Sequence, residues 1–228
     1  PQLHLKAFTA VEIHYFSKLS GLSVAEVLKA LQEAGLQSIP GGGAEILSDR
    51  VRQELCPNKA TASEWLEVQR TAHKMGIRSN ASMLYGHIET LEERVDHLLS
   101  LRALQDETGG FQTFICFPFH PGNTELEATH QRTSLWDELK TMAISRLMLD
   151  NFSNIKAYWV MLTLPIAQLA LGFGANDIDG TVSEEKIMHA AGAKSDTFLT
   201  QETIIETIRQ IGRIPVERDS MYQIIRTL

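Results

Sequence analysis

The chain has 228 residues, of which 43% are hydrophobic and 21% charged, a balance typical of a globular protein with ample core. Its formal net charge of −7 argues against a nucleic-acid-binding surface, which requires clustered Lys and Arg. The two cysteines, Cys56 and Cys116, exclude a disulfide framework, and we therefore expect a protein of the reducing cytoplasm. The most apolar stretch, residues 157–174, contains Pro165, so we expect a strand and a helix there and no membrane span.

Strand-sized apolar runs alternate with helix-sized amphipathic runs along the chain. The expected strands are residues 3–8, 36–40, 77–87, 111–124 and 155–162. The expected helices are a stretch running to residue 35, a short helix ending near 54, and then 63–76, 90–110, 134–151, 165–174, 183–192 and 200–212, with a loop at 175–181. The helix over 23–35 has a clear start signal, because Ser23 and Glu26 have the spacing of a capping box.

Regular alternation of strand and helix predicts parallel strands joined by crossover helices, in a doubly wound sheet or in a barrel. Polar side chains follow the strands, where the active sites of barrels are built, and this favours the barrel. These residues are Glu12, Glu45, Tyr85, His87, His120, Asn123, Asn176 and Asp177. Five strands cannot close a barrel of eight. We therefore expect an α/β fold, an incomplete barrel of about five parallel strands with outer helices over residues 1–228, whose front part is missing.

The run PGGGAEILSDR, residues 40–50, places three glycines before an acidic residue and a helix. Glycine suits a sharp turn or a close approach of another group. The run lacks the Lys-Ser/Thr of a P-loop and the G-x-G-x-x-G dinucleotide fingerprint. Two readings remain open: a turn with a helix-start acid, Glu45, or a site for a ligand with a cationic or hydroxyl-bearing end.

Six motifs occur in order over essentially the whole chain: HLKAFTAVEI, IPGGGAEILSDRVR, SMLYGHIET, LRALQDETGGFQTFICFPFHPGNT, GANDIDGTV and GRIPVERDSMY. Together they resemble the aminofutalosine synthase family of radical S-adenosylmethionine (SAM) enzymes, which act in menaquinone biosynthesis by the futalosine pathway. The cyclic dehypoxanthine futalosine synthases are related, but FPFHPGNT and PVERD are more similar to aminofutalosine synthase. The resemblance implies a radical SAM (β/α) barrel.

The resemblance also implies a reaction and a small-molecule substrate. SAM, reduced by a [4Fe–4S] cluster, gives a 5′-deoxyadenosyl radical, which adds to the enol-ether double bond of 3-[(1-carboxyvinyl)oxy]benzoate. Loss of a carboxylate as bicarbonate then gives aminofutalosine. The protein chiefly positions the reactants and protects the radical, since the difficult chemistry belongs to the cofactor.

The matching motifs indicate which residues of this chain correspond to the family's site residues. The implied cofactor-binding positions are Thr9, Glu12, Gly41, Gly42, Gly43, Glu45 and Arg50. The implied substrate-binding positions are Tyr85, Asn123, Asn176, Asp177 and Arg52, and the implied catalytic positions are His120 and His87. Structural roles stay open for them: a helix-start acid, an exposed helix Arg, a hydrogen-bonded loop His or an Asx-turn.

One departure from the family pattern concerns the cluster. The family holds it through a Cys-x3-Cys-x2-Cys loop, and neither Cys56 nor Cys116 has a second cysteine at that spacing. We therefore expect a chain that resembles the SAM- and substrate-facing part of the enzyme and is inactive alone. A missing N-terminal half or a second copy would be the partner that supplies the cluster ligands.

Two other hypotheses come from different classes of protein. The first is a non-catalytic half-barrel that pairs its open edges with another copy or with the missing half. The second is a Schiff-base enzyme acting through Lys6 in the first expected strand. The histidines show no H-x-H or H-E-x-x-H spacing, so we expect no protein-bound zinc.

Overall fold

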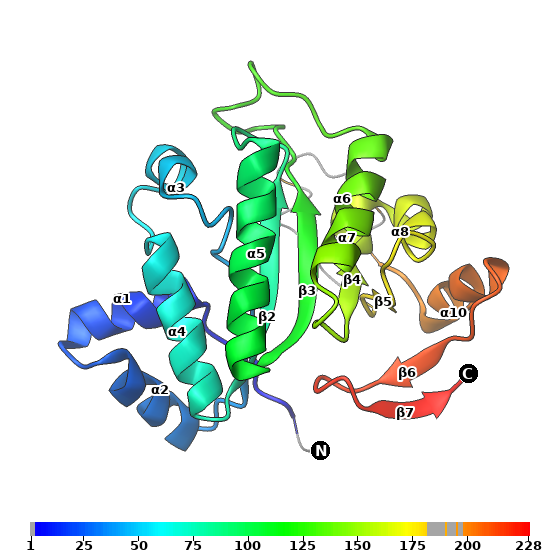
Figure 1. Ribbon diagram of the computed structural model, residues 1–228. Helices are drawn as coiled ribbons and strands as arrows, with labels where there is room; N and C mark the ends of the chain where they lie inside the picture. Colours follow the sequence, from blue (N-terminus) through cyan, green and yellow to red (C-terminus); the bar gives the residue numbers. More distant parts are fainter. Residues whose placement is uncertain (1–2, 182–189, 191–194, 196–197) are drawn as a thin grey trace. The chain divides into compact units, whose positions relative to one another are not determined.

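The computed structural model describes residues 3–181, 190, 195 and 198–228. Its main sheet has five strands in the order β1-β2-β3-β4-β5, and they are parallel, which confirms the α/β fold class. The strands are β1 (Ser38–Ile39), β2 (Arg78–Tyr85), β3 (Phe111–Pro118), β4 (Ile155–Ala157) and β5 (Asp177–Ile178). Figure 1 shows the helices and strands in chain order.

The chain divides into two compact units: residues 1–115 with 148–153, and residues 116–147 with 154–228. In the first unit β1 pairs with β2, Ser38 opposite Arg78. In the second, β4 pairs with β5, Lys156 opposite Asp177. Each pair is parallel, so within each pair the carboxyl ends of the strands lie at the same edge.

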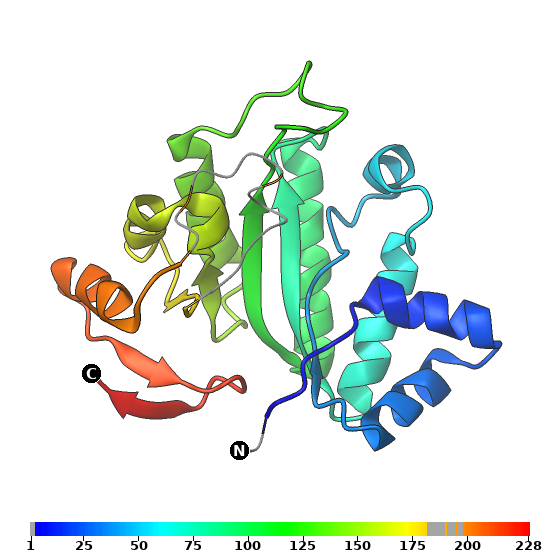
Figure 2. The same cartoon turned by 180° about the vertical axis from the view of Figure 1, so that it is seen from behind.

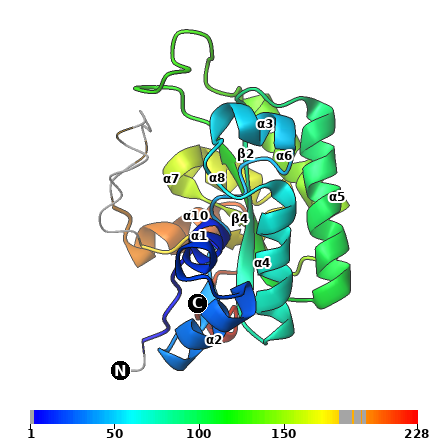
Figure 3. The same cartoon turned by 90° about the vertical axis from the view of Figure 1, so that its left-hand side faces the viewer.

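The helices of the first unit are α1 (Ala10–Ser20), α2 (Val24–Glu33), α3 (Asp49–Leu55), α4 (Ala62–Lys74) and α5 (Leu91–Thr108). Capping boxes start four of them, and the box of Ser23 and Glu26 confirms the predicted start of α2. Helices α4 and α5 contact β2, and in Figures 1 and 3 α5 lies on one face of that strand. Figure 2 shows the opposite face of β2.

The second unit contains most of α6 (Leu135–Met148), and then α7 (Trp159–Leu162), α8 (Leu164–Ala170) and α10 (Gln201–Gln210). It ends in an antiparallel hairpin of β6 (Val216–Arg218) and β7 (Ile224–Thr227), which the sequence analysis did not predict. The hairpin has no Asn-Gly or Asp-Gly turn, which is the strongest local signal for such a structure. The helix predicted over 183–192 lies almost wholly outside the described residues.

Four predicted elements were wrong in part. The strand predicted over residues 111–124 ends at Pro118, and the loop with His120 and Asn123 follows it. The strand predicted over residues 3–8 is reduced to a single parallel bridge between Lys6 and Ser38. The strand predicted over 155–162 ends at Ala157, because the chain turns into the short buried helix α7. The loop predicted over 175–181 contains β5. In the described part of the chain no helix is long and apolar enough to cross a membrane.

Candidate functional site

The glycine turn after β1 is held through its carbonyl oxygens. Ser82 of β2 donates its hydroxyl to Gly41 O, and Trp65 of α4 donates Nε1–H to Gly42 O at 3.3 Å. Arg52 of α3 donates from Nη1 to Gly43 O at 3.1 Å and to Ala44 O at 2.5 Å. Side chains from three different elements therefore fix four successive peptide groups.

Arg52 is the centre of this arrangement. It is 3% exposed, and its Nε also donates to Ala60 O at 2.7 Å. A guanidinium has five N–H groups in a fixed fork, so one side chain can hold several carbonyls at once. These contacts give Arg52 a structural task at the turn, while its predicted role in substrate binding stays a prediction.

The three glycines have a packing reason within the chain itself. A Cβ on Gly41 would lie 2.8 Å from the backbone of β2, and one on Gly42 would lie 3.2 Å from Thr9 Cγ2. Gly43 has φ +80°, and its Cβ would lie 2.5 Å from Val11 Cγ2. From the sequence, a turn or the approach of a ligand could explain these glycines. Close contacts with β2 and with Val11 already account for Gly41 and Gly43.

Glu45 ends the turn in a left-handed conformation, with φ +46°. This is unfavourable for a residue with a Cβ, and such residues cluster at functional sites. Its Oε1 pairs with Lys59 Nζ at 2.7 Å, and its backbone oxygen accepts from Leu84 N of β2 at 2.9 Å. The turn thus presents a fixed carboxylate that is 18% exposed.

Thr9 and Glu12, both predicted to bind the cofactor, form the capping box of α1. Glu12 Oε2 accepts from Thr9 N at 2.7 Å and from Thr9 Oγ1 at 2.8 Å. The structural alternative, an acid at a helix start, is therefore realised.

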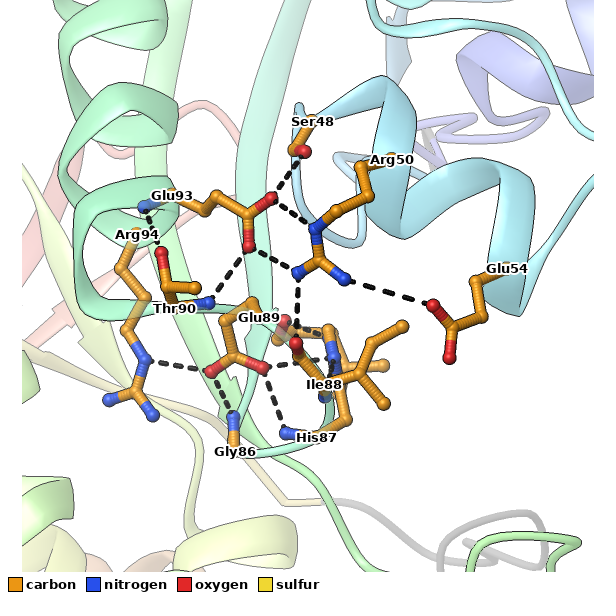
Figure 4. A network of polar contacts seen from close by, with 11 residues as sticks. Ser48, Arg50, Glu54, Gly86, His87, Ile88, Glu89, Thr90, Glu93 and Arg94 are labelled. Atoms are coloured by element: carbon orange, nitrogen blue, oxygen red, sulfur yellow. Dashed lines mark hydrogen bonds and ion pairs between the residues drawn. The ribbon is translucent and has the colours of Figure 1, made fainter.

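Figure 4 shows a polar network that joins the start of α3 to the start of α5. Glu93 accepts from Arg50 Nε at 2.9 Å and Nη2 at 2.6 Å, and from Ser48 Oγ at 2.7 Å. Arg50 Nη2 also donates to Ile88 O at 2.9 Å. The hydrogen bonds from Arg50 lower the pKa of Glu93 to about 2, so the pair is ionised over the physiological range.

The second half of the network organises the turn after β2. Glu89 accepts from the backbone N–H groups of Gly86 at 2.6 Å and His87 at 2.9 Å, and from Arg94 Nε at 2.7 Å. Burial raises the pKa of Glu89, but the hydrogen bonds from His87 and from Gly86 N–H outweigh burial and lower it to about 2. Arg94 also lies 4.8 Å from the ring centroid of Tyr85, a cation–π distance.

His87, predicted to be catalytic, has a side chain with no exposed area. Its Nε2 lies 2.9 Å from Leu84 O, and its Nδ1 lies 2.7 Å from Ile88 N and 2.9 Å from Glu89 Oε2. Both ring nitrogens are therefore engaged by the turn, and a catalytic role for His87 stays a prediction.

A fully buried histidine that was not predicted from the sequence, His97 of α5, links the segment before α3 to strand β2. Its Nδ1 accepts from Leu47 N at 3.0 Å, and its Nε2 donates to Ser82 O at 3.1 Å. Burial lowers its pKa to about 3 and keeps the ring neutral, as this pair of contacts requires. His97 has helical i, i+4, i+7 spacing with Leu101 and Leu104, which places it on the buried face of α5, but the sequence does not show which groups it contacts there.

In the second unit, His120 follows β3 and is 5% exposed. Its Nε2 lies 2.9 Å from Met161 O, an oxygen that can only accept, so the neutral ring carries its proton on Nε2 and leaves Nδ1 as an acceptor. Burial lowers the pKa of His120, which favours that neutral form. Asn123 adopts φ +56° in the same loop, and its Nδ2 donates to Ala190 O at 2.8 Å.

Asn176 and Asp177 lie at β5 and are both engaged. Asn176 Oδ1 accepts from Ile155 N at 2.8 Å and from Arg146 Nη2 at 2.9 Å. Asp177 accepts from Arg218 Nε at 2.6 Å and Nη2 at 2.8 Å, a bidentate pair that attaches the C-terminal hairpin to β5. The motif PVERD therefore contributes an anchor for this hairpin.

The second unit also contains a cavity of about 980 Å³ between β5, α10 and the β6–β7 hairpin. Its walls are largely aliphatic, with Ile204 and Ile208 of α10 among them, and Asp177 and Arg218 line it as well. The predicted site residues thus divide between the two units. Those from Thr9 to His87 lie in the first unit, and those from His120 to Asp177 lie in the second.

The residues present do not fit an iron–sulfur cluster. Cys56 caps the C-terminus of α3, and Cys116 is buried in β3. Among the described residues no three His, Cys, Asp or Glu side chains gather at a spacing suited to a metal ion. Three thiolates for a [4Fe–4S] cluster are absent from the sequence itself.

Comparison with known proteins identifies the class and then the family. Residues 3–101 match the model of the Radical SAM superfamily, and the fold agrees with that class. Residues 108–228 match the model described as the CofH/MqnC C-terminal region, which covers more than half of the chain. The chain belongs to this CofH/MqnC family of radical SAM enzymes. Membership implies SAM and a [4Fe–4S] cluster in the intact enzyme.

Individual relatives agree with this assignment. The chain is 51% identical to aminodeoxyfutalosine synthase of Thermus thermophilus, over 99% of this chain and 62% of that protein. It is 44% identical to the synthase of that name from Streptomyces coelicolor, over 99% of this chain and 61% of that protein. It is 43% identical to 5-amino-6-(D-ribitylamino)uracil–L-tyrosine 4-hydroxyphenyl transferase of Archaeoglobus fulgidus, over 98% of this chain and 66% of that protein. The chain thus spans less than two thirds of the length of these relatives.

Solved structures support the fold alone. Methylornithine synthase (PylB) superposes with a TM-score of 0.64 at 18% identity, covering 91% of this chain and 63% of that one. The [FeFe]-hydrogenase maturase HydG superposes with a TM-score of 0.64 at 17% identity, covering 87% of this chain and 44% of that one.

Proposed function

We propose that this chain is the SAM- and substrate-facing part of an aminodeoxyfutalosine synthase. The observation that carries the proposal is its 51% identity, over 99% of its length, to the Thermus thermophilus enzyme of that name. In the proposed reaction the C5′–S bond of SAM breaks and methionine leaves, and the 5′-deoxyadenosyl group adds to the enol-ether double bond of 3-[(1-carboxyvinyl)oxy]benzoate. One carboxylate is lost as bicarbonate, with the uptake of water. The site of action is the reducing cytoplasm, since the two cysteines form no disulfide framework.

The turn Gly41–Glu45 is the part of the chain that fits SAM. Its backbone is fixed by Arg52, and its acid Glu45 is held in a strained conformation beside Lys59. A fixed carboxylate suits ribose hydroxyls or an ammonium group, since both donate hydrogen bonds. When bound, SAM supplies the 5′-deoxyadenosyl group. Glu45 binds and orients it, while Arg52 keeps the turn rigid.

His120 is the proposed proton-handling residue. With the proton on Nε2 shared with Met161 O, Nδ1 is free to accept a hydrogen bond or a proton from a group of the substrate. Asn123 in the same loop is a proposed substrate contact of the second unit. Tyr85, the last residue of β2, is a proposed substrate contact of the first unit. The cluster does not fit this chain, so its ligands come from a preceding segment or from a partner chain.

The test is a product assay under anaerobic conditions with the cluster-containing holoenzyme, SAM and the enol-ether benzoate, read by mass spectrometry. The expected result is an adenosyl adduct lacking one carboxylate. A parallel reaction with L-tyrosine and 5-amino-6-(D-ribitylamino)uracil tests the chemistry of the archaeal relatives. Turnover of only that pair would overturn the proposal in favour of the transferase class.

A further inference from the structure

Strand β2 carries an unusual number of polar residues for a buried strand. Two of them have partners: Ser79 Oγ lies 2.8 Å from His73 Nε2 of α4, and Ser82 donates to Gly41 O. Asn80 lies between them and differs. It is 7% exposed, and its Oδ1 is buried with no hydrogen-bond partner among the described residues.

The side chain of Asn80 points away from the helices that cover β2. Successive residues of a strand face opposite sides, so Asn80 lies on the face opposite to Ser79, which contacts α4 through His73. This is the face of β2 that Figure 2 shows. The glycine turn runs along the same strand, since Gly41 would clash with Asn80 O if it carried a Cβ, at 2.8 Å. Asn80 therefore lies beside the turn that is proposed to bind SAM.

A buried amide oxygen without a donor is unfavourable, because it has lost its hydrogen bonds to water and gained none in the protein. Asparagine is also a poor strand former. A ligand that hydrogen-bonds the side chain of Asn80 would explain both the unpaired amide oxygen and the presence of Asn in a strand.

We propose, on the basis of the function proposed above, that Asn80 hydrogen-bonds a polar oxygen group of the bound small molecule. The ligand group is a hydroxyl, which donates to Oδ1, or a carboxylate, which accepts from Nδ2. A ribose hydroxyl of SAM and a carboxylate of the substrate both have this chemistry. Asn80 is then a binding residue that none of the sequence motifs singled out.

The test compares two substitutions of buried, unpaired amides. Asn80→Leu replaces the amide with an apolar group of nearly the same shape. Gln69→Leu is the matched control, because Gln69 of α4 is fully buried and neither of its amide atoms has a partner in the described part of the chain. Three quantities are measured on the holoenzyme: the melting temperature without ligand, the Kd for SAM by equilibrium dialysis, and the KM for the enol-ether benzoate.

The expected result for Asn80→Leu is an unchanged or higher melting temperature together with a loss of about tenfold in one affinity. A weaker Kd for SAM assigns the contact to the ribose, and a raised KM with unchanged Kd assigns it to the substrate. Gln69→Leu is expected to leave Kd and KM unchanged.

A lower melting temperature with both affinities intact would show that Asn80 is structural and would overturn the inference. If Asn80→Leu does not fold, Asn80→Ser replaces it in the test. Its Kd for SAM and its KM for the enol-ether benzoate then decide whether Asn80 contacts a ligand. Failure of the proposed function is distinguishable, since the wild-type holoenzyme would then bind SAM but form no adduct from the benzoate.

Discussion

Arg50 and Glu93 form a bidentate ion pair, with Nε–Oε1 at 2.9 Å and Nη2–Oε2 at 2.6 Å, between residues far apart in sequence. The pair joins the first turn of α3 to the first turn of α5 (Figure 4). Each of these helices follows a turn that carries predicted site residues. The same contact therefore fixes the turn after β1 and the turn after β2 relative to each other.

Glu93→Gln removes the charge of this pair while leaving the shape of the side chain. We expect the free energy of unfolding at pH 7 to fall by about 1 kcal/mol, because Arg50 is half exposed and screened by solvent. Urea denaturation measures the change. Glu92→Gln, one residue earlier on the exposed side of α5, is the matched control and should change stability by less than half as much. Equal effects of the two substitutions would contradict the assigned role.

Arg52→Lys keeps the positive charge but cannot reach three carbonyl oxygens from one planar group. We expect a loss of about 2–4 kcal/mol, because buried carbonyls are left without donors. Hydrogen exchange should show faster opening of the backbone at residues 43–47. Arg209→Lys, on the exposed side of α10, provides the comparison. A stability equal to wild type for Arg52→Lys would show that the turn is held by other contacts.

Gly43→Ala and Gly76→Ala separate two costs of adding a methyl group. Both glycines have nearly the same left-handed φ, +80° and +79°, but only Gly43 has a neighbour in the way, Val11. We expect Gly76→Ala to cost about 1 kcal/mol and Gly43→Ala at least twice as much in thermal unfolding. Adding Val11→Ala to Gly43→Ala should recover the difference. No recovery would mean that the backbone conformation alone requires Gly43.

The buried histidine His97 predicts a dependence of stability on pH. Its pKa, about 3 in the folded protein, lies below the ordinary value of 6.5, so the unfolded chain takes up a proton first as the pH falls. The stability that His97 contributes is therefore complete above about pH 6.5 and declines below it, by about 1.4 kcal/mol per pH unit. In His97→Gln the free energy of unfolding should fall less steeply with decreasing pH, because one titrating group is removed. Denaturation between pH 7.5 and 4.5 measures this slope. Parallel curves for the two proteins would contradict the assignment.

The sequence predicted the elements whose signals are local. The start of α2 is encoded by Ser23 and Glu26, and strand β3 by a long run of mainly apolar residues. The strand expected around Lys6 had the right composition but pairs with Ser38 at one position only. Strand pairing depends on residues distant in the chain, which composition does not encode.

In the candidate site too, local signals could be predicted from the sequence and contacts between distant residues could not. The motif PGGGAE marked the turn correctly, but the residues that hold it, Trp65 and Arg52, belong to helices that follow it in the chain. His97 and Asn80 were missed because their importance lies in burial and in hydrogen bonding, which only the folded chain defines.

The turn Gly41–Glu45 is proposed to bind SAM, and the Kd for SAM of the Glu45→Gln variant of the holoenzyme tests this proposal most directly. Glu54→Gln, an exposed acid on α3, is the matched control for the loss of one charge. We expect SAM to bind about tenfold more weakly to Glu45→Gln, since a charged hydrogen bond is lost, and the Kd of Glu54→Gln to be unchanged. A wild-type Kd in Glu45→Gln, with the protein folded, would contradict the claim.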